Sequence, residues 1–235
     1  MADPHSVLAE VSLATKRLVA SCQNLTDADV KAPSLLPGWS RGHVLAHISR
    51  HADSMVNLLT WARTGVVTPM YPHRQARAEG IEAGAPRPLA EQIADLEAST
   101  RRFEEAAASL PETAWDAEVR GGGGQMAARE VPFIRLREVE VHHVDLDAGY
   151  TPGQWPTRFS DRLLAEVADD FGRRAGLSPV RLRSQNLDTV IGIGDPDLTV
   201  SGDSQMLLAW LLGRSDGTGL VVTPPGPLPL VPAWK

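Results

Sequence analysis

The chain has 235 residues, of which 43% are hydrophobic and 22% are charged, and its formal net charge is −6 at pH 7. These proportions are ordinary for a soluble globular protein, and the negative charge argues against a nucleic-acid-binding protein, whose contact surface is usually basic. No apolar run approaches the roughly 20 residues of a membrane helix, and the N-terminus lacks the pattern of a signal peptide. We therefore expect a cytoplasmic protein with no membrane or nucleic-acid partner. A single cysteine, Cys22, excludes an internal disulfide framework and a cysteine-rich zinc site.

Hydrophobic periodicity predicts four long amphipathic helices in the first 150 residues. The expected ranges are 5–22, 40–63, 88–109 and 131–146, with a shorter helix over 74–83. Ser40 is a typical N-cap for the second long helix, and Gly65 is a typical residue just beyond its end. Four such helices indicate a helical bundle, in which side chains on facing helices can build metal sites.

A run of four glycines, Gly121–Gly124, separates the third and fourth long helices. It has no predicted strand before it and no Lys-Ser/Thr pair after it, so we do not expect a phosphate-binding loop. We expect the run to form the tip of a hairpin or a short connection.

The pattern changes after a predicted linker over 150–156. A helix is expected over 159–174 and another over 204–212. Short runs with a period near two are expected to be strands, and they cover 180–183, 189–193, 198–200 and 219–223. The sequence therefore predicts the α+β class, with a metal-binding four-helix bundle domain over 1–150 and a smaller α+β domain over 151–235.

Three histidines recur at intervals of four residues: His43, His47 and His51. Residues four apart lie on one face of a helix, and neutral imidazole is the commonest protein metal ligand. Glu138 and His142, also four apart, lie on the fourth long helix. One histidine of the first group and these two residues would form a His2Glu set with an open position, as in catalytic zinc sites. Such spacing also occurs by chance, and helix geometry alone does not choose firmly among the three histidines, although His47 is central and lies beside the apolar stripe.

These stretches resemble the mycothiol-dependent maleylpyruvate isomerases, which belong to the DinB-like zinc-binding helical-bundle superfamily. The similarity covers nearly the whole chain and includes Leu36–His47, Trp61–Gly65, Thr68–Tyr71, Ala76-Arg77, Arg137–Leu146 and Gly213–Gly217. The bundle segments specify only the superfamily. The segments Thr68–Tyr71 and Gly213–Gly217 point more narrowly to the isomerases.

By position, the resemblance implies that His47, Glu138 and His142 bind zinc and that Arg214 and Arg77 are catalytic, through the carboxylates of the substrate. It implies mycothiol as the thiol cofactor, whereas the residues that bind mycothiol stay unknown. The implied reaction converts maleylpyruvate to fumarylpyruvate, a step of aromatic catabolism through the gentisate pathway. A zinc-activated thiolate adds reversibly to the cis double bond, and the resulting single bond can rotate.

Two other functions fit the same residues. A mycothiol S-transferase would share the three ligands and form a stable thioether with another electrophile. A non-catalytic, metal-stabilised protein that binds a small ligand would need a closed site, completed by a residue such as His51 or His143. The expected partners of the isomerase are a small dicarboxylate substrate and a low-molecular-weight thiol.

Overall fold

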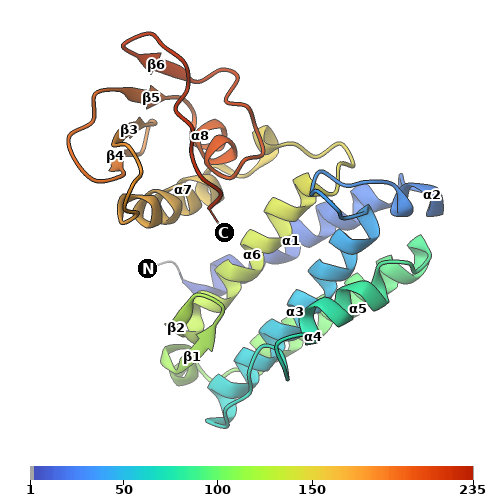
Figure 1. The fold of residues 1–235 in the computed structure, drawn as a ribbon. Helices are drawn as coiled ribbons and strands as arrows, with labels where there is room; N and C mark the ends of the chain where they lie inside the picture. Colours follow the sequence, from blue (N-terminus) through green and yellow to red (C-terminus); the bar gives the residue numbers. More distant parts are fainter. Residues whose placement is uncertain (1–2, 235) are drawn as a thin grey trace. The chain divides into compact units, whose positions relative to one another are not determined.

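The computed structural model describes residues 3–234 and divides the chain into two compact units, Met1–Tyr150 and Thr151–Lys235 (Figure 1). The first unit is mainly helical, and the second combines helices with a small sheet. This arrangement confirms the α+β class. No helix among the described residues is long and apolar enough to cross a membrane.

Four long helices form a bundle in the first unit: α1 (Pro4–Cys22), α3 (Arg41–Thr64), α5 (Leu89–Ala108) and α6 (Val131–Asp145). Each packs against two of the others, in the cyclic order α1, α6, α3, α5. Their apolar faces meet in a core that includes Leu18, Leu45, Met55, Leu96, Phe103 and Val139. The sequence predicted all four helices to within a few residues, because each carries a continuous apolar stripe at helical spacing.

The start of α3 is fixed by a capping box between Ser40 and His43. Ser40 Oγ accepts a hydrogen bond from the His43 backbone N–H at 3.3 Å, and His43 Nδ1 accepts one from the Ser40 N–H at 3.1 Å. Gly65, with a φ of 71°, ends the helix in the left-handed conformation that glycine adopts readily. Both predicted ends of this helix are therefore confirmed.

Short elements fill the connections of the first unit. The structure adds the short helix α2 (Asp27–Lys31), which the sequence analysis did not predict, and it begins with a capping box between Thr26 and Asp29. Two 3₁₀ helices, η1 (Glu112–Asp116) and η2 (Ala128–Glu130), flank a hairpin of β1 (Glu118–Gly121) and β2 (Gly124–Ala127). The glycine run therefore lies at a hairpin tip, one of the two expected alternatives.

Helix α4 (Ala76–Gly84) lies unusually close to α3, because glycines occupy the contact. A Cβ at Gly42 would lie 2.2 Å from the Ala85 carbonyl oxygen, and a Cβ at Gly84 would lie 2.8 Å from the Ala46 Cβ. The buried Gln92 amide donates to the Gly84 carbonyl at 2.9 Å and holds the end of α4 in place. This close approach brings the start of α4 next to the middle of α3.

The second unit contains a four-stranded sheet and two helices. Its elements are η3 (Pro152–Gln154), α7 (Thr157–Gly172), β3 (Val180–Arg183), β4 (Asp188–Ile191), β5 (Thr199–Ser201), α8 (Ser204–Leu211) and β6 (Val221–Thr223). The strand order is β4-β3-β5-β6, with β3 and β5 parallel and the two outer pairs antiparallel. Helix α7 packs against α8 and β4, and the buried Phe171, Leu182 and Leu208 belong to this second core.

Candidate metal centre

Side chains from α3 and α6 converge on one point of the bundle. Ligand atoms of His47, Glu138 and His142 all lie within 4.8 Å of one another. His47 Nε2 is 3.0 Å from Glu138 Oε2, and His142 Nε2 is 3.5 Å from the same oxygen. The His47 side chain is 2% exposed, whereas those of Glu138 and His142 are 18% and 16% exposed. The three residues therefore form a compact group that remains open on one side.

The electrostatics of this group favour an ionised Glu138 beside a neutral His47. Burial lowers the pKa of His47 to about 4, although the neighbouring Glu138 opposes that change. Burial acts to raise the pKa of Glu138, but the adjacent His51, His142 and His47 hold it well below its ordinary value. A neutral imidazole and an ionised carboxylate are the forms that bind a metal ion.

His142 is oriented from behind by a second carboxylate. Its Nδ1 lies 2.8 Å from Oδ2 of Asp145, which is buried at the end of α6. Burial acts to lower the pKa of His142, but hydrogen bonds to Asp145 and Glu138 outweigh burial and raise the pKa above its ordinary value. Because Asp145 occupies Nδ1, the Nε2 lone pair can point toward Glu138 and His47. Carboxylate–histidine pairs of this kind typically fix the tautomer and ring direction of a metal ligand.

We expect Asp145→Asn to weaken zinc binding by about 10-fold, because loss of a carboxylate partner of this kind typically costs 10- to 100-fold in metal affinity. The measurement is a chelator-competition titration of the purified protein with zinc. Glu112→Gln is the matched control, since Glu112 forms a similar contact at 3.1 Å with the exposed His5 on the same unit. Equal zinc affinities of Asp145→Asn and the control would contradict the assignment.

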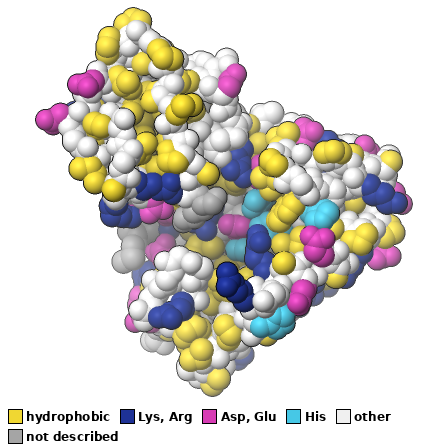
Figure 2. All heavy atoms as spheres, viewed as in Figure 1, with side chains coloured by type: hydrophobic (Ala, Val, Ile, Leu, Met, Phe, Trp, Pro, Cys, Tyr) yellow, Lys and Arg dark blue, Asp and Glu magenta, His cyan; other side chains and the backbone are white. Residues whose placement is uncertain are grey.

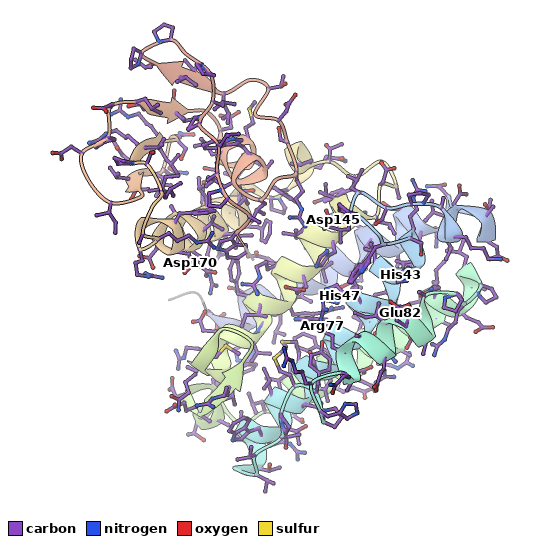
Figure 3. All side chains as sticks on the ribbon, viewed as in Figure 1. His43, His47, Arg77, Glu82, Asp145 and Asp170 are labelled. Atoms are coloured by element: carbon purple, nitrogen blue, oxygen red, sulfur yellow. The ribbon has the colours of Figure 1, made fainter. Side chains whose placement is uncertain are left out.

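Arg77 approaches the other side of His47. Its NH2 is 3.3 Å from His47 Nδ1, and its guanidinium lies 5.9 Å from the centre of the Trp39 ring. Figure 3 shows Arg77 and His47 between the helices of the first unit. Figure 2 shows basic (Lys or Arg), histidine and acidic side chains on the face of this unit that is in view. The structure therefore brings four of the five predicted site residues together. The fifth, Arg214, belongs to the second unit.

The remaining histidines near the group have other contacts. His43 caps α3, and its Nε2 is 3.5 Å from Glu82. His51 is buried one turn beyond His47, and burial holds its pKa well below the ordinary value. His143 points to α1, where its Nε2 lies 2.8 Å from Ser21 Oγ. Among the described residues, neither His51 nor His143 offers a ligand atom to the group.

Two residues near the group were missed by the sequence analysis. Burial raises the pKa of Tyr71 above its ordinary value; Ser54 and Arg77 oppose this shift, and Glu138 adds to it. Arg135 is fully buried on α6, three residues before Glu138. The available signal for Arg135 was its spacing of three from Glu138, which places both on one side of a helix.

Arg214 lies just beyond α8, where it lines a cavity of about 210 Å³ within the second unit. The cavity is also lined by Gln205 and Ser215, which provide polar atoms. Arg214 NH1 donates to the Leu212 carbonyl at 2.6 Å. The cavity thus combines a cation with polar neighbours.

Comparisons with known proteins identify a family and two similar crystal structures. The family model described as "Mycothiol maleylpyruvate isomerase N-terminal domain" matches residues 11–147. Over its full length, the chain superposes on a crystal structure of a mycothiol-dependent maleylpyruvate isomerase with a TM-score of 0.91 and 29% sequence identity. A second structure, of an isomerase variant with one histidine replaced by alanine, gives a TM-score of 0.90 at the same identity and coverage. Each structure is itself covered completely by the chain. A comparison with curated protein sequences gave no match.

Proposed function

The chain belongs to the mycothiol maleylpyruvate isomerase N-terminal domain family, and we propose that it is a zinc- and mycothiol-dependent enzyme that isomerises maleylpyruvate to fumarylpyruvate. Similarity to the isomerase structures at 29% identity over the whole of both chains supports the same activity. The observation that carries the proposal is the convergence of His47, Glu138 and His142 from two helices. No comparable group of three ligands occurs elsewhere in residues 3–234.

The donor set of this group fits zinc. Two imidazoles and one carboxylate match the ligands of catalytic zinc, which has three protein ligands and one open position. The partial exposure of Glu138 and His142 leaves that position accessible. When bound, zinc would supply Lewis-acid chemistry that lowers the pKa of a thiol toward or below neutrality. Cys22 is buried, and burial raises its pKa to about 12, so an added thiol fits better than this cysteine as the nucleophile.

Isomerisation requires the cis double bond of the substrate to become temporarily single. Addition of a thiolate forms a carbon–sulfur bond and moves the electrons of the double bond onto the keto oxygen as an enolate. Rotation about the new single bond, followed by elimination of the thiolate, restores the double bond in the trans geometry. Nothing is consumed, so the thiol acts catalytically.

Two arginines are proposed to bind the substrate carboxylates and to stabilise the negative charge of the enolate. The Arg77 guanidinium is next to His47 and can donate to a substrate carboxylate or to the enolate oxygen. Arg214 is proposed to bind a carboxylate, and its cavity with Gln205 and Ser215 supports that assignment. Fixed N–H donors of this kind stabilise developing negative charge without reorganisation.

The proposal is tested by metal analysis and a turnover assay with purified protein. We expect about one zinc per chain, and formation of the trans product that depends on mycothiol without consuming it. Accumulation of a stable thioether would indicate an S-transferase instead. Zinc-loaded protein with no turnover in the presence of mycothiol would contradict the isomerase.

A further inference from the structure

Arg135 is an unusual residue in the bundle, because its guanidinium is fully buried and mostly unpaired. The side chain is 0% exposed. NH1 donates to the Ile48 carbonyl at 2.7 Å, whereas Nε and NH2 have no hydrogen-bond partner. Among residues 3–234, no carboxylate forms an ion pair with Arg135. A buried guanidinium with no direct ion pair is costly in free energy, even though the charges of Glu138 and Asp53 partly offset the cost.

The guanidinium lies against the same turn of α3 that carries the metal ligand. Ile48, whose carbonyl binds NH1, directly follows His47. Arg135 also precedes Glu138 by three residues on α6, and the charge of Glu138 attracts it. Although burial lowers the pKa of Arg135 to about 10, the group stays protonated at neutral pH. The interior of the bundle therefore holds a permanent positive charge behind the metal ligands.

The charges of the proposed reactants explain why such a cation is useful. Two neutral imidazoles and the Glu138 carboxylate leave a bound divalent ion with one uncompensated positive charge. Arg77 and Arg135 each add one positive charge, and the Asp145 carboxylate beside His142 removes one, so the local charge is about two. A thiolate and a dicarboxylate bring three negative charges to this positive site. Buried charges are screened much less by salt than exposed ones, so a buried cation can influence a metal ion and anions bound nearby without contacting them.

We propose that Arg135 is an electrostatic positioning residue that strengthens binding of the anionic thiol and dicarboxylate while it weakens binding of the metal. This inference rests on the proposed function, since it needs the metal and the anions to occupy the same site. A purely structural role of Arg135 can be distinguished from this one. Loss of the Arg135 charge should raise the affinity for zinc and lower the affinity for the anions, whereas a structural defect should weaken both.

The test compares wild-type protein with Arg135→Met and Arg135→Gln. Glutamine keeps an N–H donor for the Ile48 carbonyl, whereas methionine removes it, and both remove the charge. We expect both variants to bind zinc about 3- to 10-fold more tightly in a chelator-competition titration. We expect zinc-loaded forms of both to bind maleate, used as an unreactive cis-dicarboxylate probe, about 3- to 10-fold more weakly in calorimetry.

Arg102→Met is the control, because Arg102 pairs with Asp53 at 2.6 Å on the surface and its removal changes the net charge equally. It should leave both affinities within about twofold of wild type. Urea unfolding of the metal-free proteins measures stability separately. The inference would be overturned if both Arg135 variants bound zinc and maleate more weakly, or if neither affinity changed. Either result would leave the proposed function standing, provided that the wild-type enzyme isomerises its substrate. Wild-type protein that binds no zinc would overturn the proposed function and the inference together.

Discussion

Replacement of His47 by alanine is expected to lower bound zinc from about one to less than about 0.1 per chain and to abolish turnover. His47 is the only one of the three proposed ligands that comes from α3, and its Nε2 lies 3.0 Å from Glu138 Oε2. Removal of one of the three proposed ligands leaves only two residues of α6, which lie four apart on one helix and cannot enclose the ion. Loss of a supporting residue alone typically costs 10- to 100-fold in metal affinity, and loss of a ligand should cost more than about 100-fold. Zinc content after dialysis and the isomerase assay provide the measurement.

His43→Ala is the matched control for this experiment, because His43 lies one turn before His47 on the same helix. Its side chain accepts a hydrogen bond from Ser40 in the capping box, so its loss should reduce stability by about 1 kcal/mol. Zinc content should stay near one per chain. If His47→Ala kept full zinc occupancy, or if both variants lost zinc equally, the proposed ligand set would be wrong.

Arg214→Ala is expected to retain zinc but to lose at least about 100-fold in turnover. Arg214 belongs to the second unit, whereas the three proposed ligands belong to the first, so its removal should not change metal content. Arg214 is proposed to hold a substrate carboxylate, and a misplacement of the bound substrate by about 1 Å can cost roughly 10²-fold in rate. Zinc analysis and steady-state kinetics on the same preparation separate these two effects.

Arg181→Ala provides a comparison within the second unit. Arg181 is a half-buried residue of β3 whose side chain is 40% exposed and pairs with Asp188 at 2.8 Å, and such surface pairs contribute little to stability. The Arg181 variant should therefore keep both zinc and turnover. Near-normal rates for Arg214→Ala would show that Arg214 takes no part in the reaction, and loss of zinc would show that it acts through the fold.

The sequence predicted the helical elements well because their signals are local. Ser40 and Gly65 marked both ends of α3, and the apolar stripes marked the buried faces. The short helix α2 was missed, because its single turn is too short to show a hydrophobic period. Its capping box between Thr26 and Asp29 was the available signal.

The sequence by itself determined the spacing of Glu138 and His142, since residues four apart on a helix always face the same side. The spacing alone did not decide which of the three histidines of α3 would bind the metal, and the family resemblance pointed to His47. Only tertiary structure decided that His47 meets Glu138, that Asp145 orients His142, and that Arg135 points into the core. The physical reason is that the helical period fixes only the direction in which each side chain leaves the axis of its own helix. The rotation and height of α3 relative to α6 depend on how their side chains pack, and the two helices lie about 90 residues apart in the chain.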